Sequence, residues 1–281
     1  MTRVGLFARM SREGVTGHVD RQLRSLKRLY RVEVFDFDGT LPEELDLDLA
    51  VVLGGDGTLL GAARYLAPRG ISAVGINLGR FGFLAGCDAS RCVSVVEGAL
   101  SGRLKAVSRS MLSARILSED AEGEKMSALN DVTLTASVPA HMIGVALLIN
   151  GTKVCAFQGD GLIIATATGS TAYNLSSGGP LVSPSEDVII LTGLAPHTLS
   201  IRPMVISGDD VVEAQVSARH SDIAVTADGQ VARIVSPGGL LRVELAPFRF
   251  ELYEDENWSF YSVVRSKLGW GMELNYAQDS D

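Results

Sequence analysis

Residues 47–66 read LDLAVVLGGDGTLLGAARYL, and their pattern predicts the fold of the first part of the chain. The apolar run 47–53 has the length and composition of a buried β-strand, and helical spacing resumes at Leu59. Between them, Gly54-Gly55-Asp56-Gly57-Thr58 places a carboxylate at the carboxyl end of a strand, where α/β sheets bind ligands. The glycines and the helix N-terminus favour an anion such as phosphate, and Asp56 is placed to take a proton from an attacking hydroxyl. An ordinary Gly-Asp-Gly turn with Thr58 capping the helix is an equally weighted alternative.

The surrounding sequence predicts two lobes and a C-terminal segment. Strand patterns at 3–8, 31–37 and 71–76 alternate with helix patterns at 15–30 and 88–100, which is typical of a Rossmann-like parallel sheet with crossover helices. From Gly102 to about residue 246 the pattern changes to short strands separated by turns, and Asn150-Gly151 marks a tight hairpin. A helix at 258–268 is expected to return to the first lobe. We therefore expect an α/β domain at 1–101, a mostly β domain at 102–250 and a docking C-terminal segment at 251–281.

Composition and charge exclude several classes of protein. Of the 281 residues, 46% are apolar and 21% are charged, which is ordinary for a globular protein. The net charge is −8 and no basic stripe is present, so nucleic acid is not an expected partner. Apolar runs stop well short of the ~20 residues that cross a bilayer, and no secretion signal is recognised at the start, so we expect a cytoplasmic protein without a membrane partner. The 3 cysteines and 4 histidines lack metal-binding spacing, and no metal-ligating residue is assigned.

A second glycine-rich stretch, residues 159–180, concentrates polar side chains. Five hydroxyl-bearing residues fall within eight positions, namely Thr166, Thr168, Ser170, Thr171 and Tyr173. They could line a polar ligand pocket, in which Tyr173 would offer a flat face for stacking on a base or ribose. The alternative is a threonine-rich strand followed by a capped helix start. The density of small residues favours the ligand site.

Taken in order, the motifs of this chain closely resemble those of the NAD kinases. The series consists of the glycine run at 54–58, NLGRFGFL at 77–84, Asn130-Asp131, residues 160–180, PHTLSIRP at 196–203 and Asp228-Gly229-Gln230. The first motif alone is shared with a wider superfamily of lipid and sugar kinases. The ordered series, which spans nearly the whole chain, is specific to the NAD kinases.

The resemblance implies an activity and a set of site residues. In that family the aspartate that matches Asp56 activates the 2′-hydroxyl of the adenosine ribose of NAD, which attacks the terminal phosphate of ATP or polyphosphate and gives NADP. The donor phosphates would then lie on the glycine loop, formed by Gly54, Gly55, Gly57 and Thr58. The residues that match NAD-binding positions are Asp56, Gly57, Phe83, Asn130, Asp131, Asp160, Thr171, Ala172, Tyr173, Ser176, Ala195 and Asp228. The resemblance also implies a homo-oligomer, either a dimer or a tetramer. In the family, the aspartate that matches Asp228 is often contributed across a subunit contact.

The chemistry of phosphoryl transfer implies a metal ion, and three residues of the chain differ from the family pattern. Phosphoryl transfer needs positive charge on the donor phosphates, and the chain has no P-loop lysine, so Mg²⁺ or another divalent ion is implied, coordinated largely by those phosphates. Arg80 and Arg202 are candidates for additional positive charge, and the favoured alternative for each is an ordinary surface or fold-stabilising arginine. The family more often has Glu at the position of Asp131, usually Pro at Ala167 and usually Leu at Phe81.

Two other functions stay open at this stage. A catalytically silent NAD-binding sensor is compatible with the departures at Asp131 and Ala167. A lipid or sugar kinase of the wider superfamily would share the glycine loop at 54–58. Residues 168–173 favour the NAD kinases over that rival, and no basic amphipathic segment offers contact with a lipid surface.

Overall fold

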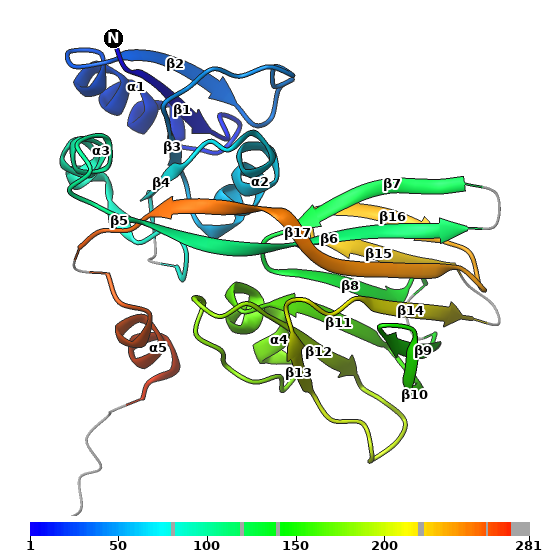
Figure 1. Ribbon diagram of the computed structural model, residues 1–281. Helices are drawn as coiled ribbons and strands as arrows, with labels where there is room; N and C mark the ends of the chain where they lie inside the picture. The colour runs from blue at the N-terminus through cyan, green and yellow to red at the C-terminus, as the bar shows by residue number, and fades with distance from the viewer. Residues whose placement is uncertain (80–81, 119–120, 139–140, 219–221, 257, 271–281) are drawn as a thin grey trace, which may run out of the picture.

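The computed structural model describes residues 1–79, 82–118, 121–138, 141–218, 222–256 and 258–270. Within these ranges the chain forms an α/β lobe, a lobe built of two β-sheets, and a C-terminal helix (Figure 1). The predicted fold class is therefore confirmed. No helix of the described ranges is long and apolar enough to cross a membrane.

The first lobe is a parallel sheet covered by helices on both faces. Its elements are β1 (Arg3–Ala8), α1 (Val15–Leu26), β2 (Arg31–Asp36), β3 (Leu49–Leu53), α2 (Asp56–Leu66), η1 (Ala67–Arg69), β4 (Ala73–Asn77), β5 (Cys87–Asp88), η2 (Ala89–Arg91) and α3 (Cys92–Leu100). The strand order is β2-β1-β3-β4, and all neighbouring pairs are parallel. Helices α1 and α3 pack on one face and α2 on the other. Every residue of β3 and β4 is buried, which explains their unbroken apolar runs.

The second lobe is a sandwich of two sheets around one hydrophobic core. Its elements are β6 (Ala106–Ser118), β7 (Ala121–Ala128), β8 (Asp131–Ala136), β9 (Ile143–Ile149), β10 (Thr152–Gly159), β11 (Gly161–Thr166), η3 (Thr168–Thr171), α4 (Tyr173–Ser176), β12 (Val188–Leu194), β13 (Met204–Ser207), β14 (Val212–Ser217), β15 (Ile223–Ala227), β16 (Val231–Val235) and β17 (Leu240–Tyr253). One sheet has the antiparallel order β13-β12-β11-β8-β15-β16. The core lies between this sheet and the strands β6, β9, β14 and β17.

Strand β17 connects the two lobes through a shared sheet. It pairs with β6 along its length, and its last residues, Leu252 and Tyr253, pair in parallel with β4 of the first lobe. Figure 1 shows β17 crossing from one lobe to the other. The limits of the three predicted segments, 1–101, 102–250 and 251–281, stay a prediction. Strand β17 continues past residue 250 to Tyr253 and joins strands of both lobes into one sheet.

The C-terminal segment contacts the first lobe, as the sequence predicts. After β17, Asp255 forms an ion pair with Arg91, with 2.6 Å between Oδ1 and Nη1. The indole of Trp258 packs against Gly86, where an added Cβ would lie 2.2 Å from the indole. Helix α5 (Phe260–Leu268) follows, with Val264 buried. The predicted helix at 258–268 is thus present and begins two residues later.

Two hairpin turns have positive φ angles at both central residues, and the first of them is the turn predicted at Asn150-Gly151. Asn150 and Gly151, between β9 and β10, have φ angles of 51° and 75°. Asp228 and Gly229, between β15 and β16, have φ angles of 51° and 61°. Positive φ at both central residues matches the twist of two paired strands, so each turn is tight.

Candidate active site

The glycine loop at 54–58 lies where the strand order of the first lobe reverses. In the order β2-β1-β3-β4 the chain switches direction between β1 and β3, and the loop leaves the carboxyl end of β3 at that point. Ligands of open α/β sheets bind in this crevice. Helix α2 begins at Asp56, and Gly55 is its N-cap residue without a side-chain cap. The alternative in which Thr58 caps the helix is therefore wrong: its hydroxyl is buried and has no hydrogen-bond partner in the described part of the chain.

Backbone N–H groups from a second loop hold the carboxylate of Asp56. Its Oδ2 accepts a hydrogen bond from Phe83 at 2.8 Å, and its Oδ1 accepts from Leu84 at 3.1 Å and Ala85 at 3.0 Å. The loop approaches this closely because residue 82 is glycine: a Cβ at Gly82 would lie 2.0 Å from Oδ1. Because Oδ2 accepts from one described N–H group, it keeps a lone pair for a further donor such as a hydroxyl.

A pocket of about 340 Å³ in the second lobe gathers five of the predicted NAD-binding residues. It is lined by Asn130, Asp131, Thr133, Ala172, Tyr173, Thr226, Asp228 and Gly229. Tyr173 is 49% exposed, so one side of its ring is available for stacking. The pocket thus combines polar side chains with an aromatic face, as a site for a base and a ribose would.

Asp131 carries an ionisable group into this pocket. The residue is only 5% exposed, and no described residue donates a hydrogen bond to its carboxyl group. Burial, together with the nearby charge of Asp228, raises the pKa of Asp131 to about 7. The carboxyl group is therefore partly protonated near neutral pH and can accept or donate a hydrogen bond to a ligand hydroxyl.

This raised pKa predicts a pH-dependent stability. Between about pH 4 and pH 7 the folded chain keeps a proton on Asp131 that the unfolded chain has released, so the free energy of unfolding falls as pH rises, by at most about 1.4 kcal/mol per unit. Asp131→Asn has no carboxyl group at this position, so its free energy of unfolding should lack this fall with rising pH. The difference in free energy of unfolding between Asp131→Asn and wild type should be more favourable to the variant at pH 8 than at pH 5 by roughly 2.5 kcal/mol in denaturant unfolding. An equal difference at both pH values would refute the assignment.

Asp228 lines the pocket but has a structural task in the same chain. Its side chain is fully buried and forms a 2.5 Å ion pair with Arg64 of α2. It also accepts backbone hydrogen bonds from Leu129 at 3.2 Å, Asn130 at 2.7 Å and Asp131 at 3.3 Å. Asp228 therefore fixes the backbone that presents Asn130 and Asp131. Its role as an NAD ligand stays a prediction.

The hydroxyl-rich run at 166–173 contributes less to the pocket than the sequence suggests. The hydroxyl of Thr166 donates to Leu129 O at 2.6 Å, that of Ser170 donates to Val182 O at 3.1 Å, and that of Thr171 donates to Thr168 O at 3.2 Å. These three hydroxyls fix the backbone of the loop instead of lining the pocket. Of the five, Tyr173 is the residue that lines it.

Ala167 opens this loop in a conformation that proline also adopts. Its φ of −56° falls inside the range that the pyrrolidine ring imposes, and the preceding Thr166 is in a strand, as residues before proline prefer. We expect Ala167→Pro to raise the free energy of unfolding by about 0.4–1 kcal/mol, because it restricts the unfolded chain. Thermal unfolding measures this, and a lower midpoint would show that the buried site has no space for the ring.

Asp160 and Ala195 lie together, but away from the pocket. Asp160 N donates to Leu194 O at 2.9 Å, and Ala195 has a φ of 40°, which is uncommon for alanine. Both stand beside Gly161, the first residue of β11, whereas Asn130 and Asp131 stand beside its last two residues. The two ends of this six-residue strand are about 17 Å apart.

The remaining predicted residues are scattered around these two places. Ser176 is exposed on α4, and Phe83 is partly buried in the loop that holds Asp56. Arg202 is exposed and bonds to the carbonyl of Ile201. Arg80 and Phe81 lie outside the described residues. Arg64 and Gln230 have no predicted role, although Gln230 belongs to the motif Asp228-Gly229-Gln230.

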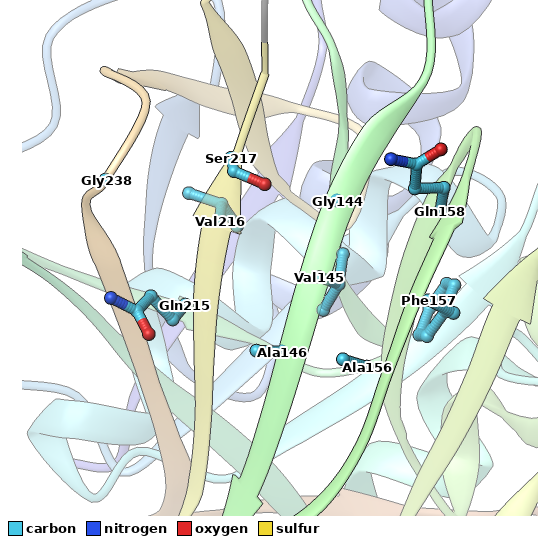
Figure 2. Close-up of a pocket in the computed structure, with 10 residues that line it drawn as sticks. All are labelled: Gly144, Val145, Ala146, Ala156, Phe157, Gln158, Gln215, Val216, Ser217 and Gly238. Atoms are coloured by element: carbon cyan, nitrogen blue, oxygen red, sulfur yellow. The ribbon is translucent and has the colours of Figure 1, made fainter.

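A second hollow, of about 440 Å³, lies on the outer surface of β9, β10 and β14. Figure 2 shows Gly144 and Ala146 on the central strand, with Gln158, Gln215 and Ser217 on the flanking strands. The hollow exists because the central strand has small side chains. It contains no ionisable group and none of the predicted site residues, so we do not assign chemistry to it.

The described residues do not form a ready-made metal site. No group of three or more His, Cys, Asp or Glu side chains that could hold a metal ion occurs within the described ranges. A cation at this site would need ligands from a bound substrate.

A glycine loop at a helix N-terminus, together with a pocket that carries an aromatic face and a free carboxyl group, defines the chain as a nucleotide-binding protein. Comparison with known proteins is more specific. Residues 11–104 match the family model of the ATP-NAD kinase N-terminal domain, and residues 129–254 match that of the ATP-NAD kinase C-terminal domain. The NAD kinase of Klebsiella pneumoniae is 39% identical over 237 residues, which cover 84% of this chain and 81% of that protein. The chain therefore belongs to the NAD kinase family and is an enzyme that phosphorylates NAD.

Solved structures agree with this assignment. An NAD kinase from Archaeoglobus fulgidus in complex with ATP is 29% identical, with a TM-score of 0.78, and the match covers 96% of this chain and 99% of that one. A yeast NADH kinase complexed with NADH has the same fold, with a TM-score of 0.87 at 22% identity over 99% of this chain and 90% of that one.

Proposed function

We propose that the chain transfers the terminal phosphate of ATP or polyphosphate to the 2′-hydroxyl of the adenosine ribose of NAD, with Asp56 as the general base. The placement of Asp56 supports this most: it lies at the ligand-binding edge of the sheet, and its Oδ2 retains a lone pair. Asp56 takes the hydroxyl proton and the ribose oxygen bonds to the terminal phosphorus. The bond from that phosphorus to its bridging oxygen breaks, which releases ADP or shortened polyphosphate.

We propose that the pocket at Asn130, Asp131 and Tyr173 binds the acceptor. Carboxyl and amide groups suit ribose hydroxyls, and the exposed tyrosine ring suits a base. The other predicted NAD contacts are Gly57, Phe83, Asp160, Thr171, Ala172, Ser176, Ala195 and Asp228. The proposed acceptor is NAD, as in the family to which the chain belongs.

The donor phosphates are proposed to bind the loop of Gly54, Gly55, Gly57 and Thr58. This loop leads into α2, whose N-terminus attracts anions, and the buried Thr58 hydroxyl beside it has no hydrogen-bond partner among the described residues. The related Archaeoglobus fulgidus structure holds ATP. Because the described chain has no cluster of three metal-ligating side chains, Mg²⁺ fits here as an ion carried by the donor phosphates. It would neutralise charge on the phosphate oxygens.

We also propose a homo-oligomer, located in the cytoplasm. Asp160 and Ala195 match ligand-binding positions, yet in one chain they stand about 17 Å along β11 from the pocket. A second copy could bring such residues to the pocket of the first. Light scattering on the purified protein should give the mass of a dimer or a larger assembly, and a monomer at working concentration would contradict this proposal.

One assay separates this function from the two alternatives. The purified protein is incubated with NAD and ATP or polyphosphate, with Mg²⁺ or with EDTA, and an NADP-specific dehydrogenase reports the product. We expect NADP with Mg²⁺ and none with EDTA. NAD binding without NADP would favour the silent sensor. Phosphate transfer to a lipid or sugar in place of NAD would favour the wider superfamily.

A further inference from the structure

A chain of hydrogen bonds joins the glycine loop of the first lobe to the pocket of the second. Gln230, at the tip of the β15–β16 hairpin, donates from Nε2 to the carbonyl of Gly57 at 2.7 Å. Arg64 of α2 donates from Nη2 to Gln230 Oε1 and from Nη1 to Asp228 Oδ2, both at 2.5 Å. We call Gly57, Arg64, Asp228 and Gln230 the interlobe clasp.

The clasp ends on the backbone of the pocket. The Asp228 carboxylate pairs with Arg64 and also accepts hydrogen bonds from the backbone N–H groups of Asn130 at 2.7 Å and Asp131 at 3.3 Å. One continuous path therefore runs from the carbonyl next to Asp56 to the amides of the two residues proposed to hold the acceptor ribose. Every link along it is a hydrogen bond or an ion pair.

The charges and burial of the clasp indicate a fixed geometry. The side chain of Arg64 is 14% exposed and that of Asp228 is 0% exposed, so the ion pair is shielded from water and its planar guanidinium sets the angle between α2 and the hairpin. Gln230, in contrast, is exposed. A contact that only stabilised the two lobes would not need to reach Gly57, the residue beside Asp56.

We infer that Arg64 and Gln230 are positioning residues that set the distance between the Asp56 carboxylate and the acceptor hydroxyl held at Asn130 and Asp131. This inference rests on the proposed function, because it assumes Asp56 as the base. Neither residue touches the reacting atoms. Gln230 holds the first turn of α2 at Gly57, and Arg64 links Gln230 to the carboxylate of Asp228.

Gln230→Ala is the first test, because an exposed side chain can be removed without unfolding the protein. A shift of the order of 1 Å between reacting groups lowers turnover by about tenfold to a hundredfold. We expect a kcat loss of that size for NADP formation, with an NAD dissociation constant that stays within about twofold in calorimetry. Unchanged kcat, or a loss that appears only in KM, would overturn the inference.

Two further variants separate positioning from general stability. Arg64→Lys keeps the charge opposite Asp228 but loses the second nitrogen that reaches Gln230, so its kcat should lie between those of wild type and Gln230→Ala. Arg69→Met is the matched control: this arginine bonds to Glu43 O and Tyr65 O within the first lobe alone. It should lower the unfolding temperature without changing kcat. Equal kcat losses in Gln230→Ala and Arg69→Met would show that the interlobe clasp only stabilises the fold, and would overturn the inference.

A double-mutant cycle with Asp56→Asn connects the clasp to the base. If the clasp acts by positioning Asp56, then Gln230→Ala should cost little further turnover in the Asp56→Asn background. Additive losses would overturn the inference while leaving the base intact. Full turnover in Asp56→Asn alone would instead overturn the proposed function, so the two failures are distinguishable.

Discussion

Asp56→Asn is expected to lower the turnover for NADP formation by about 10²–10⁴-fold, the usual contribution of a positioned general base. An amide cannot accept the proton of the ribose hydroxyl. NAD affinity should change little, because the pocket at Asn130 and Asp131 belongs to the other lobe. Steady-state kinetics with the coupled dehydrogenase and calorimetry with NAD measure the two quantities separately.

The same substitution also disturbs the loop that holds Asp56, and this effect needs its own control. An asparagine NH₂ group would face one of the N–H donors at Phe83, Leu84 or Ala85. Asp36 provides a match: its Oδ1 accepts N–H groups from Met10 at 3.1 Å and Asp38 at 3.0 Å in the same lobe. Asp36→Asn should lose a comparable amount of stability with unchanged turnover. If both variants lose turnover equally, Asp56 acts only as a structural acceptor.

Gly82→Ala is expected to lower turnover by at least about tenfold and to destabilise the fold by about 1–3 kcal/mol, the cost of forcing atoms into an occupied site. A Cβ at this position would come within 2.0 Å of Oδ1 and 2.3 Å of Cγ of Asp56. The carboxylate and the 82–85 loop would have to separate, which would break the hydrogen bonds that orient the base. Kinetics and denaturant unfolding of the purified variant measure both effects.

Gly79→Ala is the matched control in the same stretch of chain. A Cβ at Gly79 would meet no atom within 4 Å, and the residue does not have a positive φ. Turnover and stability should therefore remain close to wild type. If Gly82→Ala also behaves like wild type, then the close approach to Asp56 does not matter for the base.

Much of the fold follows from local pattern. The strands of the first lobe were predictable because β3 and β4 are buried on both faces, so each reads as a short apolar run, and the run of β3 ends at Gly54. The Asn150-Gly151 turn was predictable because positive φ favours this pair. Helix α1 was predicted to reach residue 30 but ends at Leu26. Leu29 and Tyr30 continue the helical spacing, yet they belong to the turn that leads into β2.

The candidate site was predictable in its residues more than in its contacts. The sequence indicates Asp56 and Asn130-Asp131, but the donors to Asp56 come from residues 27 to 29 positions later and depend on Gly82. Nothing local marks Arg64, which reaches Asp228 across 164 positions. The hydroxyls near Thr166 were misplaced for a related reason: a threonine that bonds to a distant carbonyl looks the same in sequence as one that faces a ligand.

The position of the phosphate on the product tests the proposed transfer to the 2′-hydroxyl of NAD most directly. NAD and MgATP are incubated with the wild-type protein, and phosphorus NMR identifies which oxygen of the dinucleotide has been esterified. We expect a monoester at the 2′-hydroxyl of the adenosine ribose, formed together with ADP and absent with Asp56→Asn. A phosphate on another hydroxyl, or NAD that binds and stays unmodified, would contradict it.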